Sequence, residues 1–218
     1  MTPETFLALL IRAGKLKTSV RHCWLAKGRQ ESVADHSWRM ALMALLLAHV
    51  PEFSQVDLDR VIHLCLIHDL GEAFTGDIPT FQKDRADREE ENRIYQDWLQ
   101  TFPEEDRKEW EALLSEWESQ TSKEAQVSRA LDKMDSFSVC HCLRLEAVIS
   151  HNESDIRTWL PLEHSLQFTY PEKAVSFSPW LKALKQLVDQ WTRQKEKDAG
   201  FRTPSAGQGA AGRPWSRA

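Results

Sequence analysis

The sequence has few cysteines and no long apolar run. Four cysteines in 218 residues are too few for a disulfide framework. No apolar stretch approaches the roughly 20 residues that cross a bilayer. The first residues also lack the basic region and cleavage site of a secretory signal. These absences argue against a membrane-spanning or secreted protein, and we expect a cytoplasmic one.

A block of basic residues is also missing. The chain carries 33 acidic and 28 basic residues, for a formal net charge of -5, and it has no cluster of Lys and Arg that could follow a phosphate backbone. We therefore expect neither a nucleic acid polymer nor a membrane among its partners.

Period-2 alternation of apolar and polar residues is absent as well, whereas apolar residues recur at helical spacing through nearly the whole chain. The pattern predicts an all-α protein with a single domain over residues 1–198. Residues 199–218 are rich in Gly, Ala, Ser and Pro and are expected to form a disordered tail. The expected helices cover residues 3–14, 57–70, 87–101, 103–118, 122–150 and 179–197, and a further helix contains the apolar run over residues 38–50.

Local signals set several ends of these helices. Ser32-Val33-Ala34-Asp35 has the form of a capping box, in which the two outer side chains satisfy backbone N–H groups at a helix start. Gly71 is expected to end the helix over residues 57–70. Residues 74–83 contain glycine and proline and are expected to be irregular, and residues 15–29 are expected to form a connecting segment.

Three places in the sequence hold residues that commonly bind metals, namely His36, the doublet His68-Asp69 and Asp132. Two imidazoles and two carboxylates suit a divalent cation such as Mn, Co, Fe, Zn or Mg. Four protein ligands around an octahedral ion leave about two positions for water and substrate, which hydrolysis requires. Taken singly, these residues have simpler explanations, since His36 could be a hydrogen-bonded core histidine and Asp132 could pair with a neighbouring lysine or arginine.

Three segments, ESVADHSWRMALMALLLA, HLCLIHDLGEAFTGDIP and SRALDKMDSF, carry a family resemblance. From about Lys17 to Ser150 the chain resembles the HD-domain phosphohydrolases, and within them the 5'-deoxynucleotidase group. An HD doublet alone is weak evidence, whereas HDxxExxTGD with an upstream SVADH and a downstream LDKxD is specific. The resemblance implies an HD-domain helical bundle with motif core 17–150 that forms a homodimer. It also implies one divalent metal ion held by His36, His68, Asp69 and Asp132.

The same resemblance implies that Glu72 and Asp77 act in catalysis beside the metal. If the preceding helix continued through Gly71, Asp69 and Glu72 would share one face, and Asp77 on the following loop could return over the metal. We expect Glu72 to orient or deprotonate the attacking water and Asp77 to manage the proton on the leaving 5'-oxygen. These two roles could be exchanged.

Two residues upstream of the metal motif are expected to bind substrate. Arg21 matches the phosphate-contacting arginine of the group, and its guanidinium could hold phosphate oxygens as a fork; the alternative is a loop arginine in solvent. Trp24 could stack on the nucleoside or gate it, unless it packs in the core. In the bacterial members that the chain resembles, the matching arginine and tryptophan are adjacent, whereas His22 and Cys23 separate Arg21 from Trp24 here. The preference between deoxyribose and ribose therefore stays open.

One further absence bears on the number of metal ions. No histidine occurs between Leu70 and Leu131. HD proteins with two metals have a pattern similar to H...HD...H...H...D, with extra histidines between the doublet and the last aspartate. We therefore expect a single metal ion. With it, the resemblance implies a phosphomonoesterase that converts (deoxy)nucleoside 5'-monophosphates to nucleoside and phosphate. One alternative is an HD hydrolase for another phosphorylated metabolite, because metal ligands do not define the leaving group. The other is a non-catalytic helical module with a structural metal site.

Overall fold

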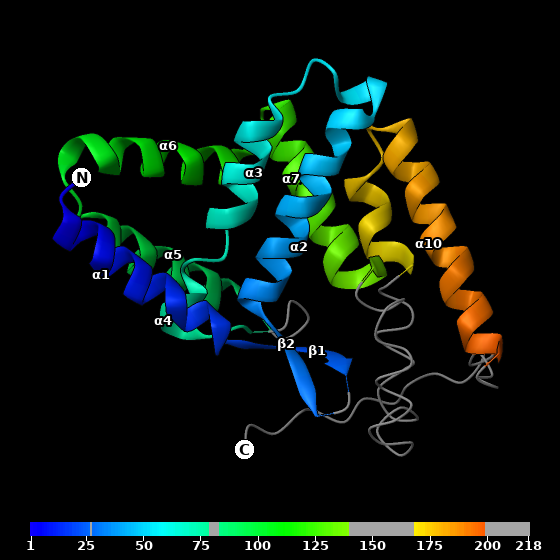
Figure 1. The fold of residues 1–218 in the computed structure, drawn as a ribbon, viewed down its shortest axis with the longest axis horizontal. Coiled ribbons are helices and arrows are strands. Elements are labelled where there is room, and N and C mark those ends of the chain that lie inside the picture. The colour runs from blue at the N-terminus through cyan, green and yellow to red at the C-terminus, as the bar shows by residue number, and fades with distance from the viewer. Residues whose placement is uncertain (27, 79–82, 140–167, 199–218) are drawn as a thin grey trace.

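The structure is a computed structural model that describes residues 1–26, 28–78, 83–139 and 168–198, without the side chains of residues 22, 24, 26 and 137–139. Within these ranges the chain is mostly helical, which confirms the prediction of an all-α protein (Figure 1). No helix in them is both long and apolar enough to cross a membrane. The tail predicted over residues 199–218 lies outside the described residues.

Three helices form the centre of the molecule: α2 (Val33–Leu46), α3 (Leu58–Ile67) and α7 (Lys123–Lys133). Both α2 and α7 pack against α3 (Figure 1). Removing their apolar side chains from water is the main term that stabilises such a centre. All three helices contribute buried side chains to one core, namely Met40, Ala44, Val61, Leu64, Cys65, Ala130 and Leu131.

The outer helices flank this centre on two sides in Figure 1. Helices α1 (Pro3–Ala13), α5 (Arg85–Leu99) and α6 (Glu104–Ser119) lie on one side, and α10 (Pro179–Asp198) lies on the other. Helices α5 and α6 bury their apolar stripes and expose charged faces, as their amphipathic sequences predict. By contrast, α1 buries no residue. The short elements are the 3-10 helices η1 (Gly14–Lys17), η2 (Leu47–His49) and η3 (Pro51–Phe53), and residues 168–174 are also helical.

The predicted start of α2 is confirmed. Oγ of Ser32 accepts a hydrogen bond from the backbone N–H of Asp35 at 3.1 Å, and the Asp35 carboxylate accepts one from the N–H of Ser32 at 3.0 Å. These two bonds complete the capping box. Because the box fixes the first turn of the helix, it also fixes the position of His36, which follows directly.

The connecting segment predicted over residues 15–29 contains more structure than expected. After η1, strands β1 (Val20–Ala26) and β2 (Arg29–Ser32) form a two-stranded antiparallel hairpin. The pairing register shifts twice along this hairpin. Such irregular strands lack the apolar-polar alternation by which a sequence reveals a strand. The hairpin matters because it carries Arg21 and Glu31.

The sequence placed two other helix ends wrongly. Helix α3 ends at Ile67, since residues 68–71 form turns with hydrogen bonds three residues apart, and the short helix α4 (Glu72–Thr75) follows. The long helix predicted over residues 122–150 stops as an α-helix at Lys133 and passes into the π-helix η4 (Met134–Val139). Residues 140–150 lie outside the described part of the chain.

Candidate metal centre

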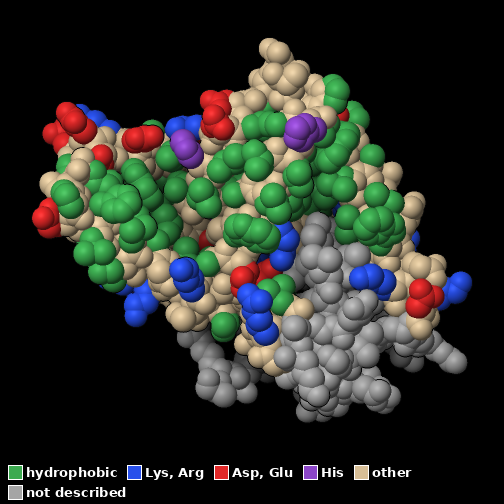
Figure 2. Space-filling view, viewed as in Figure 1, with side chains coloured by type: hydrophobic (Ala, Val, Ile, Leu, Met, Phe, Trp, Pro, Cys, Tyr) green, Lys and Arg blue, Asp and Glu red, His purple; other side chains and the backbone are tan. Residues whose placement is uncertain are grey.

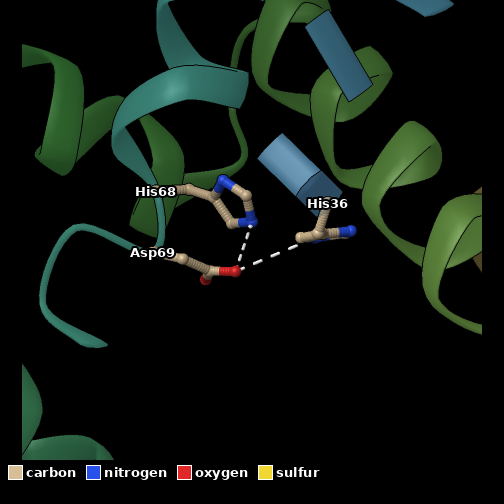
Figure 3. A group of neighbouring side chains, drawn as sticks. All are labelled: His36, His68 and Asp69. Carbon is tan, nitrogen blue, oxygen red and sulfur yellow. Dashed lines mark ion pairs between the residues drawn. The ribbon is translucent and has the colours of Figure 1, made fainter. Parts of the chain in front are cut away.

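The side chains of His36, His68 and Asp69 point toward one another (Figure 3). His36 projects from the first turns of α2, and His68 is the C-cap of α3. Oδ2 of Asp69 lies 3.0 Å from Nε2 of His68 and 3.8 Å from Nε2 of His36. The centroids of the two imidazole rings are 5.5 Å apart. The three side chains are thus close enough to hold one ion together.

Hydrogen bonds behind the two rings determine which nitrogen faces the cluster. Nδ1 of His36 lies 2.6 Å from the Asp135 carboxylate, and Nδ1 of His68 lies 3.0 Å from the carbonyl oxygen of Cys65. Because a carboxylate and a carbonyl only accept, each Nδ1 donates, and a neutral ring keeps its lone pair on Nε2. Both Nε2 atoms are buried without a hydrogen-bond partner within the described ranges. Two such lone pairs beside carboxylates fit a divalent cation.

Asp132 reaches the same cluster from α7. One of its oxygens, Oδ1, lies 3.5 Å from Nε2 of His36 and accepts a hydrogen bond from Ser136 at 3.2 Å. The other oxygen pairs with Nζ of Lys133 at 2.9 Å. The ion pair considered as an alternative to a metal role is therefore present, yet it leaves Oδ1 beside His36. The structure brings together all four residues predicted as ligands, and their binding of a metal stays a prediction.

Burial and neighbouring charges shift the pKa values of this cluster in opposite directions. Burial and Arg21 act to lower the pKa of His36, but its interactions with Asp132 and Asp135 raise it to about 9. Burial acts to raise the pKa of Asp69 and of Asp132, but the nearby histidines, with Lys133 at Asp132, hold both values below their ordinary range. The cluster therefore favours positive charge at its centre, as a cation site does.

Glu72 is buried at the start of α4, and its Oε2 has no hydrogen-bond partner among the residues that the structure describes. Burial, followed by the charges of Asp69 and Asp77, raises the pKa of Glu72 to about 10. From the sequence, Asp69 and Glu72 would share one helix face if the helix continued through Gly71. Instead, the turns at residues 68–71 separate them, and both still line the same cavity.

Helix α5 packs directly against this turn. A Cβ atom built on Gly71 would stand 3.0 Å from Cγ of Glu91 on α5, so only a glycine fits here without a shift. Glu91 forms an ion pair with Lys83, whose Nζ also lies 3.8 Å from Oε1 of Glu72. The sequence reasoning did not select Lys83, which the structure places beside a predicted catalytic residue.

Arg21 is buried within the site, so the alternative of a loop arginine in solvent is wrong. Its Nη1 lies 3.7 Å from Asp69 and 3.9 Å from Asp77, and its Nη2 donates to Ser136 at 2.8 Å. A guanidinium among these groups is placed to meet an anion beside the metal cluster. Trp24 pairs through its backbone with β2, but its side chain lies outside what the structure describes.

These groups line a cavity of about 410 Å³. Trp117 forms part of its wall, with its ring centroid 4.6 Å from that of His68, and the Arg129 guanidinium lies 4.2 Å from the same Trp117 ring. A polar cavity of this size suits a small molecule. Beside six acidic residues, the lining contains five basic ones that can meet an anion, namely Arg21, Lys83, Arg88, Arg129 and Lys133.

Three residues that the sequence reasoning gave no role lie behind the site. Arg39 donates to Glu31 and to Asp135, and Glu31 lies 3.1 Å from Nε of Arg21. Asp135 is part of the LDKxD motif, and Glu31 and Arg39 lie in the segment ESVADHSWRMALMALLLA, but neither segment indicates that these residues pair with one another. Glu31, His36 and Asp135 are themselves close enough to hold a metal. The Arg39 guanidinium, however, bonds to both carboxylates and supplies the positive charge there.

Comparisons with known proteins find similar sequences. The 5'-deoxynucleotidase HDDC2 of Homo sapiens is 35% identical over 137 residues, which cover 61% of this chain and 65% of that protein. The protein of the same name from Mus musculus is 37% identical over 134 residues, which cover 59% and 65%. The matching part of the chain thus spans about 65% of the length of these curated relatives.

The fold is shared with a solved structure, that of a predicted metal-dependent phosphohydrolase from Magnetospirillum magnetotacticum MS-1. The two align with a TM-score of 0.66 at 21% identity, covering 92% of this chain and 98% of the other. The family model described as HD domain matches residues 13–185. Because this match takes in most of the sequence, the chain belongs to the HD domain family.

Proposed function

We propose that this protein is a metal-dependent phosphomonoesterase that converts (deoxy)nucleoside 5'-monophosphates to nucleoside and phosphate. The observation that carries the proposal is that two buried imidazole nitrogens, which make no hydrogen bond within the described residues, converge on Asp69, and that Arg21 lies 3.7 Å from the same carboxylate. Three of the predicted metal ligands, His68, Asp69 and Asp132, line one cavity together with Arg21. Relatives named 5'-deoxynucleotidase support the choice of substrate.

One divalent ion, which would be Mn, Co, Mg, Zn or Fe, would be held by His36, His68, Asp69 and Asp132. When bound, the ion supplies Lewis acidity that offsets phosphate charge and makes water a better nucleophile. The protein fixes both imidazoles through their Nδ1 hydrogen bonds before any ion binds. Such preorganisation lowers the cost of assembling the site.

The phosphate group would bind to Arg21. This guanidinium is buried, so its attraction for an anion is only weakly screened by solvent. Glu31 and Ser136 hold two of its nitrogens, which orients the third, Nη1, toward Asp69 and Asp77. Arg21 therefore meets phosphate oxygens on the side of the predicted metal ligands.

Glu72 and Asp77 would carry the protons of the reaction. A buried Glu72 with a pKa raised to about 10 holds a proton in the metal-free site, and an added cation favours its ionised form. The ionised carboxylate then accepts a proton from the attacking water, while Asp77 supplies the proton that the leaving 5'-oxygen takes up. The roles of the two carboxyl groups could be exchanged.

Phosphate release by the purified, chelator-treated protein tests this function. We expect turnover of 5'-monophosphates, but not of 3'-monophosphates, only after Mn, Co, Mg, Zn or Fe is added. His68→Ala should abolish it, and His63→Ala, on the same helix but outside the cluster, should not. Matched deoxy and ribo substrates measure the part played by Trp24. No release from any nucleotide with any of these metals would refute the nucleotidase proposal.

A non-catalytic module with a structural metal site is the weaker alternative. Such a module would not need Glu72 buried with an unpartnered oxygen, nor Arg21 beside two carboxylates. An HD hydrolase for another phosphorylated metabolite stays compatible with the same catalytic groups, because the ligands define the reaction better than the leaving group. Phosphate release from a panel of sugar phosphates distinguishes it from the nucleotidase.

We also propose that the protein forms a homodimer through the apolar face formed by α1 and α2. Figure 2 shows hydrophobic side chains gathered over these helices. Large contiguous apolar surfaces are characteristic of interfaces. Ile11→Glu combined with Leu45→Glu should convert a dimer to a monomer in sedimentation analysis, and Leu187→Glu on α10 should not. The hydrophobic side chains of α1 and α2 that are more than half exposed are Phe6, Leu7, Leu10, Ile11, Trp38, Leu45 and Leu46.

A cytoplasmic location completes the proposal. Cys65 is buried as a free thiol, which suits a reducing compartment. Imaging of the tagged chain beside a cytoplasmic marker tests this location. A signal confined to the secretory pathway would contradict it.

A further inference from the structure

A buried chain of ion pairs and hydrogen bonds connects the phosphate side of the site to the metal side. It contains Arg21 and Glu31 from the hairpin, Arg39 and His36 from α2, and Asp135 from η4. Glu31 and Asp135 are both 0% exposed. Two carboxylates that are this deeply buried require partners, because an unpaired buried charge is strongly destabilising.

Arg39 is the shared partner of these two carboxylates. Its Nε and Nη2 both donate to Asp135, the latter at 2.9 Å from Oδ2, and its Nη2 also donates to Glu31. A planar guanidinium can hold two carboxylates in fixed relative positions, which the single point charge of a lysine cannot do. The distance between Glu31 and Asp135 is therefore set by the geometry of one side chain.

Each carboxylate holds one residue of the proposed active site. Asp135 accepts from Nδ1 of His36, which directs Nε2 at the cluster and leaves the lone pair of the neutral ring on Nε2. Glu31 pairs with Nε of Arg21, which leaves Nη1 beside Asp69 and Asp77. The network thus has a metal branch through Asp135 and a phosphate branch through Glu31, and the two branches meet at Arg39.

We propose that Arg39 is a positioning residue that fixes His36 through Asp135 and Arg21 through Glu31, and so sets the spacing between metal and phosphate. The inference rests on the proposed function for the identity of the two ligands. Arg39 acts through the two carboxylates, so it is not itself a catalytic residue. The branched arrangement makes a specific prediction. A substitution in one branch should weaken the binding of one ligand, metal or phosphate, and a substitution at Arg39 should weaken the binding of both.

Binding measurements on single variants of the whole chain test this prediction. Asp135→Asn is nearly isosteric, but its amide can donate to Nδ1 of His36 and so move the ring proton to Nε2. We expect the dissociation constant for Mn²⁺, measured by calorimetry, to rise about 10- to 100-fold. The dissociation constant for inorganic phosphate, measured on Mn²⁺-saturated protein, should change less than about twofold.

Glu31→Gln should give the opposite pattern, with phosphate binding weakened about 10-fold and Mn²⁺ binding nearly unchanged. Arg39→Met should weaken the binding of both. Arg60→Met is the matched control, because Arg60 pairs with Glu116 at 2.8 Å outside this network, and it should change neither affinity. If Arg39→Met fails to fold, the two isosteric carboxylate variants still decide the question.

Two results would overturn the inference. One is an equal loss of both affinities in Asp135→Asn and in Glu31→Gln, since that would indicate general loosening of the fold. The other is no change in either affinity in any of the three variants. A wild-type chain that binds neither Mn²⁺ nor phosphate would remove the proposed site altogether. A chain that binds both but hydrolyses no nucleotide would refute the proposed function alone.

Discussion

Charged residues are used in opposite ways in two regions of this molecule. On the outer face of α5, pairs such as Arg85–Glu89, at 2.6 Å, lie in solvent. Beneath the metal cluster, Glu31 and Asp135 are completely buried and bonded to Arg39. Water and salt screen the exposed pairs, whereas a buried carboxylate that loses its partner destabilises the fold. The same side-chain chemistry therefore contributes solubility in one region and exact geometry in the other.

The largest expected difference between the regions is in catalysis. Glu72→Gln keeps the shape of the side chain and removes its ability to take a proton, so turnover should fall by roughly 10²- to 10⁴-fold. Mn²⁺ binding by calorimetry should remain. Glu89→Gln, on the exposed face of α5, should leave both unchanged. Equal turnover in the two variants would show that Glu72 moves no proton.

The next effect is on stability. Arg39→Met leaves two buried carboxylates without their shared cation, and the free energy of unfolding should fall by about 3 to 5 kcal/mol. Urea unfolding of the variant and of the unaltered chain measures the difference. A fall of less than about 1 kcal/mol, the range of exposed ion pairs, would mean that this buried network contributes no more to stability than an exposed pair.

Removal of the metal should make stability depend on pH. The folded pKa values are raised at His36, to about 9, and at Glu72, to about 10, from ordinary values of 6.5 and 4.5. Between pH 6.5 and about 9 the folded metal-free chain keeps a proton on His36 that the unfolded chain has released, and between pH 4.5 and about 10 it does so on Glu72. The free energy of unfolding therefore falls as pH rises, by up to about 1.4 kcal/mol per pH unit for each group.

Urea midpoints at pH 6.5 and pH 9, measured with chelator and with saturating Mn²⁺, check this expectation. The chelated chain should lose stability toward pH 9. The metal-loaded chain should not, since metal binding requires the deprotonated ligands that high pH provides. Glu72→Gln should remove the part of the slope that Glu72 contributes. A flat profile in chelator would contradict the charge balance described for the cluster.

The smallest effect is expected on the outer face. Arg85 is 91% exposed in its pair with Glu89, where solvent screens the interaction. Arg85→Ala should leave the thermal midpoint unchanged within error at low and high salt. A clear loss of stability at low salt would show that the outer charges form a stabilising network after all.

The predictions from sequence succeeded where the signal was local. The start of α2 followed from a capping box four residues long, and the amphipathic stripes of α5 and α6 followed from their periodicity. The four predicted metal ligands came from a spaced motif, and the structure brings them together. The hairpin was missed because its register is irregular, so its residues show no alternation.

The network behind the site was missed for a different reason. Arg39 and Asp135 are 96 residues apart in the chain, and His36 and Asp135 are 99 apart. A pairing over such a separation leaves no periodic trace in one sequence, because each partner alone resembles an ordinary charged helix residue. Only the packing of α2 against α3 and α7 brings these elements into contact.

The glycine between Asp69 and Glu72 separates two properties of the site. A single methyl group at Gly71 would press on Glu91, and Glu91 holds Lys83 at the cavity wall. Alanine at this position would therefore require the Glu91 side chain to move by a few tenths of an ångström, and Lys83 is bonded to that side chain. The carboxylates on either side of Gly71 would stay in place. A substitution here can thus shift a basic side chain of the cavity without removing any reacting group.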